Sequence, residues 1–128
     1  MKKTAPITFL GDRAQYSLGN SDYFASCGVL LCPVGGGRLR VAVAVHTIHG
    51  RMVKLGFPVI SLYEWDGEQW LAKSGVIAKF TYNAAAHRCL FTCKGDPGKC
   101  YCVSASFFAE DSRGSDSLIA YSMTVTAR

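Results

Sequence analysis

The segment YFASCGVLLCPVGGGRLRVAVAVHT, residues 23–47, contains the strongest fold signal in the chain. Two long apolar runs flank three consecutive glycines, and the second run alternates valine with alanine, arginine and histidine. Alternation with a period of two is typical of a β-strand with one buried face, and glycine accepts the positive φ of tight hairpin turns. The segment therefore predicts a β-hairpin that turns at the glycines.

Strand and turn signals continue through the rest of the chain. VISLYEW and EQWLAK flank Asp66-Gly67, a dipeptide typical of two-residue hairpin turns, which would place Tyr63 opposite Trp70. Further strands are expected over GVIAKFTYN, HRCLFTC, CYCVSASFFA and DSLIAYSMTVTA. The pattern predicts an all-β (or β-rich α+β) fold with little helix. We expect an antiparallel β-sandwich or half-open barrel of about seven or eight short strands.

Length and composition indicate one folded unit. With 128 residues and 49% hydrophobic residues, the chain can bury a core, and we expect a single domain over 1–128 with residues 1–6 flexible. The N-terminal lysines precede no apolar run of signal-peptide length, and no segment is apolar enough to span a bilayer. We expect a protein that is cytoplasmic in the producing cell, or delivered to a target-cell cytosol without a classical signal peptide.

The glycine hairpin could bring a thiol and an imidazole close together. A turn at glycines 36–37 places Cys27 opposite His46, with both side chains on one face about 4.5–5.5 Å apart at Cβ. A turn at glycines 35–36 places Cys27 opposite Ala44 instead, and a β-bulge would also shift the pairing. The sequence leaves both registers open.

A facing Cys27–His46 pair would support nucleophilic chemistry. The imidazole could take the thiol proton, and the thiolate could attack an amide or ester carbon. Gly28 and Ser26 are the candidate substrate-binding or oxyanion residues, because a glycine beside the nucleophile lets a substrate approach the backbone. The structural alternative is a buried thiol that faces a satisfied imidazole.

At this hairpin the sequence resembles the catalytic domains of the cytotoxic necrotising factors and of Burkholderia lethal factor, which are glutamine deamidases with a β-sandwich core. Residues 23–27 stand where that family has an aromatic residue and a Leu-Ser-Gly-Cys motif, although Phe-Ala-Ser precedes the cysteine here. The glycines and the strand over 38–45 follow, and His46 stands at the place of the family's histidine.

The resemblance implies a toxin-like or effector-like protein glutamine deamidase that contributes to virulence. Cys27 would attack the carboxamide of a glutamine in a partner protein, and His46 would act as general acid and base. The backbone carbonyl of Ser21 would orient the histidine. Water would then release glutamate, and the reaction would need no cofactor and no metal.

The second cysteine group lies in HRCLFTCKGDPGKCYC. A hairpin turn at Asp96-Pro97 would place Cys93 opposite Cys100, which allows either a face of small core residues or a cross-strand disulfide. A zinc site is a third interpretation, although the spacing matches no zinc ribbon or knuckle. The aromatic residues of the Asp66-Gly67 hairpin could likewise form a binding platform or ordinary cross-strand packing.

Two classes of function therefore remain open. The first is the cysteine-dependent deamidase. The second is a non-enzymatic, small, basic β-sandwich that acts as an inhibitor, coat-like protein or recognition module. The net charge of +5 is compatible with nucleic acid binding, although the basic residues are spread singly and also suit a solvated surface. We expect a protein substrate or partner and no membrane partner.

Overall fold

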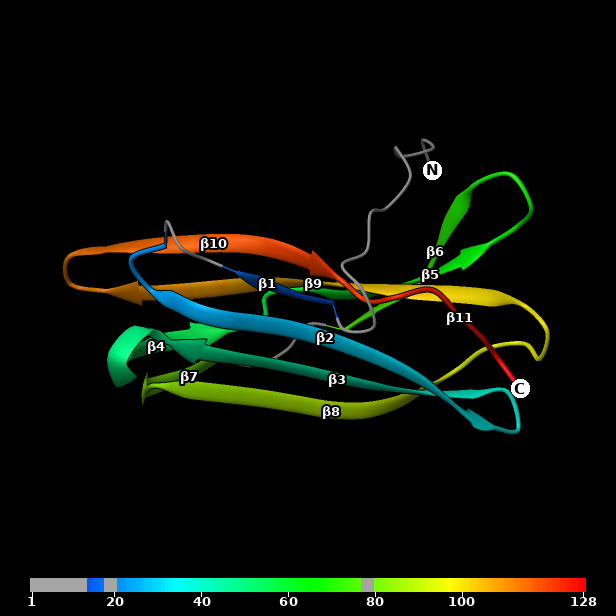
Figure 1. The fold of residues 1–128 in the computed structure, drawn as a ribbon, viewed down its shortest axis with the longest axis horizontal. Coiled ribbons are helices and arrows are strands. Elements are labelled where there is room, and N and C mark those ends of the chain that lie inside the picture. Colours follow the sequence, from blue (N-terminus) through cyan, green and yellow to red (C-terminus); the bar gives the residue numbers. More distant parts are fainter. Residues whose placement is uncertain (1–13, 18–20, 77–79) are drawn as a thin grey trace.

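The computed structural model describes residues 14–17, 21–76 and 80–128. These residues form two antiparallel β-sheets packed as a sandwich, and the sheets do not close into a barrel (Figure 1). The predicted all-β sandwich is confirmed, with one short 3₁₀ turn, η1 (Ile48–Gly50), and more strands than expected. The expectation that residues 1–6 are flexible lies outside the described residues.

The first sheet, sheet A, has four strands in the order β1-β2-β3-β8. Their bounds are β1 (Ala14–Ser17), β2 (Phe24–Gly35), β3 (Arg38–Thr47) and β8 (Ala86–Lys94). The glycine hairpin of β2 and β3 makes up its centre, as Figure 1 shows. Both long apolar runs of the hairpin are therefore strands of one sheet, as the alternation predicts.

The second sheet, sheet B, is built around β9 (Cys100–Asp111). On one side β9 pairs with β5 (Ile60–Trp65) and β4 (Val53–Gly56), which in turn pair with β6 (Trp70–Val76) and β7 (Phe80–Ala84). On the other side it pairs with β10 (Gly114–Tyr121) and β11 (Val125–Thr126). The hairpin of β5 and β6 projects from one end of the sandwich (Figure 1).

Between the described strands, three connections carry the chain from one sheet to the other. They follow β3, β7 and β8, so that β7 pairs with β4 while β8 pairs with β3. At the third crossing Gly95 packs against the ring of Tyr101, which a Cβ atom at Gly95 would approach to 2.8 Å. The expected hairpin around Asp96-Pro97 is therefore wrong, because the chain arches between the layers there instead of folding back within one sheet.

The core lies between the sheets and is made by alternate residues of the long strands. Val41, Val43 and Val45 of β3 are almost completely buried, as the alternation predicts. From sheet B, the rings of Phe57, directly after β4, and Phe107 of β9 also enter the core and pack edge to face, with centroids 5.5 Å apart. Burial of such side chains is the main term that stabilises a sandwich of this kind.

A polar cluster joins the sheets at one end of the sandwich. Asp111 of β9 accepts hydrogen bonds from the hydroxyl of Tyr23 (2.9 Å) and from the guanidinium of Arg51 (2.6 Å). The backbone N–H of Arg113 also donates to this carboxylate. That backbone hydrogen bond, with the bonds from Tyr23 and Arg51, lowers the pKa of Asp111 to about 2 despite some desolvation.

Candidate functional site

The glycine turn forms at the second pair of glycines. Gly36 and Gly37 have φ of 64° and 77°, and Gly35 pairs with Arg38. Directly after this pair the register shifts, because Val34 is an extra residue between the paired residues Pro33 and Gly35. The turn thus lies at the glycines, as the sequence predicts, but β2 carries a bulge next to it.

The bulge separates the two candidate catalytic side chains. Cys27 pairs with Val45, and His46 pairs with Ser26, so the predicted register that sets Cys27 opposite His46 is wrong. Because side chains alternate along a strand, a shift of one residue moves the thiol to the face opposite the imidazole. Cys27 is completely buried and His46 is exposed, so the structure does not bring them together.

The surroundings of Cys27 favour the neutral thiol. Burial, with a smaller contribution from the charge of Asp116, raises the pKa of Cys27 to about 12. A nucleophilic cysteine needs the opposite shift, towards a thiolate near neutral pH. The thiol of Cys27 therefore behaves as a small apolar core group.

The other predicted site residues lie in different surroundings. The hydroxyl of Ser21 donates to Asp116 (2.9 Å) and accepts the backbone N–H of Phe24 (2.9 Å). Gly28 pairs with Ala44, next to Ser26 in the outer face of the sheet. Of the predicted set, the structure brings together Ser26 and His46, whose Oγ and Nδ1 atoms lie 3.4 Å apart.

The second cysteine group is divided between the sheets. Cys93 lies on β8 in sheet A and Cys100 lies on β9 in sheet B, so the predicted Cys93–Cys100 pairing is wrong. All six cysteines are free thiols. In the part of the chain that the structure describes, no group of three or more histidine, cysteine or carboxylate side chains is placed to hold a metal ion.

The aromatic hairpin has a longer turn than its dipeptide indicates. Asp66 Oδ1 accepts the backbone N–H groups of Glu68 and Gln69, both at 2.8 Å, which favours a four-residue loop. Trp65 therefore pairs with Trp70, and the predicted pairing of Tyr63 with Trp70 is wrong. The two indole rings meet at 5.3 Å, and Trp70 is buried, so this contact is mainly packing within the hairpin.

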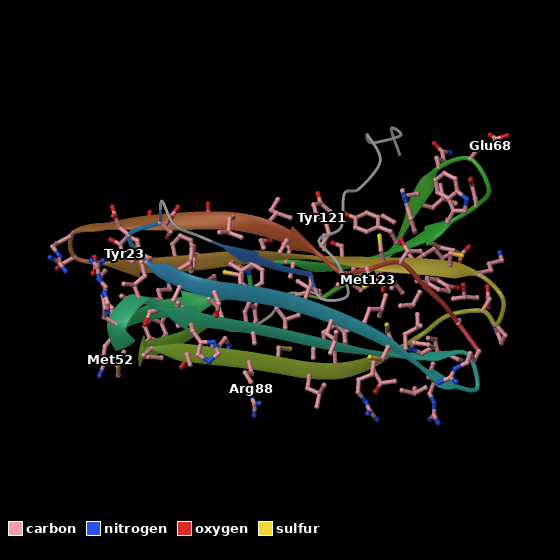
Figure 2. All side chains as sticks on the ribbon, viewed as in Figure 1. Tyr23, Met52, Glu68, Arg88, Tyr121 and Met123 are labelled. Atoms are coloured by element: carbon pink, nitrogen blue, oxygen red, sulfur yellow. The ribbon has the colours of Figure 1, made fainter. Side chains whose placement is uncertain are left out.

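A basic surface on sheet A was not foreseen from the sequence. The residues of β2, β3 and β8 that point away from the core form one outer face, here named the basic face. Its members are Ser26, Gly28, Leu30, Cys32, Arg38, Arg40, Ala42, Ala44, His46, Ala86, Arg88, Leu90, Thr92 and Lys94. Figure 2 shows Arg88 projecting from β8 away from the sandwich.

The charge on the basic face has one sign. Arg38, Arg40, Arg88 and Lys94 are exposed, and the three strands contain no aspartate or glutamate. The ion pairs found among residues 14–17, 21–76 and 80–128 use other cations and lie elsewhere. The positive charges of the basic face are thus left for a partner or for solvent.

Strand pairing fixes the spacing of these cations. Arg38 pairs with Lys94, so their Cβ atoms lie about 4.5–5.5 Å apart. Arg40 is two residues along the same strand from Arg38, or about 7 Å, and pairs with Thr92. Arg88 lies further along, opposite Ala44. Ala42, Thr92 and the exposed Leu90 lie between Arg88 and the other three cations.

The sequence contained part of the signal for this face. Arg38 and Arg40 are two residues apart, so they lie on the same face of their strand, opposite the buried valines. Arg88 and Lys94 are six residues apart and likewise share one face of theirs. What the sequence could not indicate is that β8, about fifty residues later in the chain, pairs with β3. Without that pairing the four cations appear as single, scattered charges.

Comparisons with protein-family models, with curated proteins and with solved structures find no match to this chain. The similarity to the glutamine deamidases therefore stays a prediction from residues 21–47. None of the described residues belong to a helix with the length and apolarity that crossing a membrane requires.

Proposed function

We propose that this protein is a non-enzymatic β-sandwich module that binds nucleic acid through its basic face. The observation that carries the proposal is the set of four exposed cations on β3 and β8, on strands without a single carboxylate. Phosphate backbones are recognised by such cations, and arginine presents a planar fork that matches phosphate oxygens. This geometry does not favour the cysteine-dependent deamidase, because its candidate nucleophile and base lie on opposite faces of the hairpin.

The composition of the basic face favours phosphate contacts over base recognition. No aromatic side chain lies among its members, so the face lacks the rings on which unpaired bases stack. Its remaining side chains are alanine, glycine, serine, threonine, cysteine, leucine and histidine. We therefore expect binding with little sequence preference and a strong dependence on salt.

A nucleic acid fits the face better than an anionic membrane surface does. Membrane-surface binding needs a continuous apolar area with aromatic or leucine anchors next to the cations. The large apolar side chains exposed on the basic face are Leu30 and Leu90, which lie on either side of Ala42 in one short row. A row of two leucines and one alanine provides little insertion, whereas four cations on one face suit contacts with phosphates.

Fluorescence anisotropy with labelled single-stranded and duplex oligonucleotides over a salt series tests the proposal. We expect binding whose logarithm falls linearly with the logarithm of salt concentration, with a slope on duplex DNA of about −3 to −4 for four contacts. The double variant R40A/R88A should lower the magnitude of that slope by about 2 and weaken binding to all sequences alike.

The matched control is K73A/R113A, which removes two exposed cations outside the basic face. It should bind as the unmodified protein does. Vesicles that contain anionic phospholipid provide the second comparison. The proposal is overturned if oligonucleotides do not bind, if both double variants weaken binding equally, or if vesicles bind and oligonucleotides do not.

A further inference from the structure

Strand β8 is a long and regular sheet edge. In the described part of the chain it pairs with β3 on one side, and it is the longest strand at the rim of either sheet. Nine consecutive residue pairs join it to β3, from Arg38–Lys94 to His46–Ala86, with no bulge. It also contains no proline. Such an edge presents unpaired backbone groups that can pair with another strand.

Two other edge strands, β6 and β7, are interrupted, whereas β10 pairs with β9 over eight residues without a bulge and is one residue shorter than β8. In β6 the register shift leaves Lys73 unpaired, which places a bulged lysine on that rim. In β7 a register shift accompanies Asn83, whose φ is +52°. Bulges and lysines at edges are devices that prevent pairing with other chains. The absence of a bulge from β8 therefore indicates an edge suited to a partner strand.

Two backbone hydrogen bonds show which residues of β8 point to the free edge. The N–H of Thr47 donates to the carbonyl of Ala85, and the N–H of Gly95 donates to the carbonyl of Gly37. Because such pairs alternate along an antiparallel ladder, odd-numbered residues of β8 bond to β3. Its even-numbered residues, including Leu90, direct their N–H and C=O groups away from the sheet.

We propose that β8 pairs antiparallel with β8 of a second copy of this chain, around a two-fold axis at Leu90. The two four-stranded sheets would then form one continuous sheet. An interface of this kind is isologous, since the same strand contributes from both copies. The proposal goes beyond nucleic acid binding and does not depend on it.

The side chains of β8 favour a two-fold axis at Leu90 over an axis at Phe91 or Arg88. With the axis at Leu90, all nine residues of the strand are paired, Leu90 faces its own copy, and Arg88 faces Thr92 of the second copy. Leu90 is 68% exposed in the single chain, so the contact removes a large apolar side chain from water. An axis at Phe91 would instead set Arg88 opposite Lys94, and one at Arg88 would set two arginines opposite each other.

Light scattering after size-exclusion chromatography, over a series of protein concentrations, tests the pairing. The unmodified chain should have the mass of two copies. Leu90→Lys places two lysines opposite each other at the axis and should raise the dimer dissociation constant by about tenfold or more. Leu30→Lys is the matched control, because it adds the same charge to the basic face on β2, inside the sheet. It should remain dimeric.

Cysteine cross-linking tests the register itself. Cα atoms of a hydrogen-bonded antiparallel pair lie about 5.5 Å apart, within the range that a disulfide spans. Under mild oxidation Leu90→Cys should therefore form a covalent dimer on a non-reducing gel, well above the level of the unmodified chain. Arg88→Cys should not, since the two copies of position 88 lie about 13 Å apart along the strands in this register.

Several outcomes overturn the proposal. They are a monomeric unmodified chain at every concentration, equal dissociation of the Leu90→Lys and Leu30→Lys variants, and cross-linking by Arg88→Cys in place of Leu90→Cys. Circular dichroism of each variant distinguishes a lost dimer from a lost fold. The chain can dimerise without binding oligonucleotides or bind them as a monomer, so the two proposals fail separately.

Discussion

Cys27 lies with its thiol in the core, opposite Val45 and with no exposure to water. Its side chain points inward because Val34 adds one residue to the ladder beside the glycine turn. The same step turns His46 outward, beside Ser26. At the scale of single residues, one extra amino acid thus decides whether the hairpin holds a catalytic pair or a buried thiol.

Thiol labelling with iodoacetamide, read for each cysteine by mass spectrometry, checks the position of Cys27. We expect Cys27 and Cys102 to react more slowly than the partly exposed Cys32, Cys89 and Cys100, because burial raises the pKa of both slow thiols to about 12. In urea the six rates should converge.

His46→Ala is the control for this experiment. The variant should leave the labelling rate of Cys27 unchanged, since the imidazole lies on the other face of the sheet. Fast labelling of Cys27 in the folded protein that slows in His46→Ala would contradict the observed register and restore the hydrolase hypothesis.

The glycine hairpin shows what sequence patterns indicate about an element. The alternation predicted both strands, and of the two turns that the sequence left open, the structure has the one at glycines 36–37. The bulge at Val34 had no separate signal, because its neighbours Pro33 and Gly35 fit a plain strand end and turn equally well. Turn residues are specified locally, whereas the count of residues between turn and core depends on which side chains the opposite sheet accepts.

Substitutions at the two turn glycines should differ in effect. Alanine at Gly36 would have to adopt φ of 64°, although no atom beyond its chain neighbours lies within 4 Å of its Cβ. We expect the free energy of unfolding to fall by about 1–2 kcal/mol. Alanine at Gly37, at φ of 77°, would also meet the carbonyl oxygen of Gly95 at 2.7 Å. We expect a further loss of about 1–3 kcal/mol there.

Urea unfolding followed by circular dichroism measures both free energies of unfolding. Equal losses for Gly36→Ala and Gly37→Ala would show that the contact between the glycine turn and the loop after β8 contributes nothing to stability.

At the scale of the whole molecule, the sheets are joined by an apolar core and by the polar cluster around Asp111. Arg51 and Tyr23 approach this carboxylate from segments that flank sheet A, while Asp111 ends the central strand of sheet B. The guanidinium of Arg51 also lies over the ring of Tyr23, 4.2 Å from its centroid. These contacts bring together residues almost ninety positions apart in the chain.

The cluster should make stability depend on pH. The pKa of Asp111 is lowered from 3.8 to about 2 in the folded chain, so folding favours the carboxylate. The contribution of Asp111 to the free energy of unfolding is complete above the ordinary pKa of an aspartate. It is lost as pH falls from about 4 to about 2. In urea titrations over this range, Asp111→Asn should show a smaller acid loss of stability than the unmodified chain.

Asp22→Asn is the control for the acid titration. It removes an exposed carboxylate nearby without touching the bonds to Asp111, and should retain the acid loss of the unmodified chain. An acid loss in Asp111→Asn as large as that of the unmodified chain would exclude this cluster as its cause.

The sequence by itself determined the local features of this protein. Period-two alternation predicted strands, glycines predicted the central turn, and together they predicted an all-β sandwich. These features follow from each residue and its near neighbours, because side-chain alternation and backbone φ are set within a few positions.

Only the tertiary structure decided which strands are neighbours and which face each side chain occupies. β8 pairs with β3 and not with β9, which gathers four scattered cations on one face and separates Cys93 from Cys100. A bulge beside the glycines buries Cys27 and exposes His46. Pairing and register depend on how both sheets fill a common core, and this is a property of residues far apart in the chain.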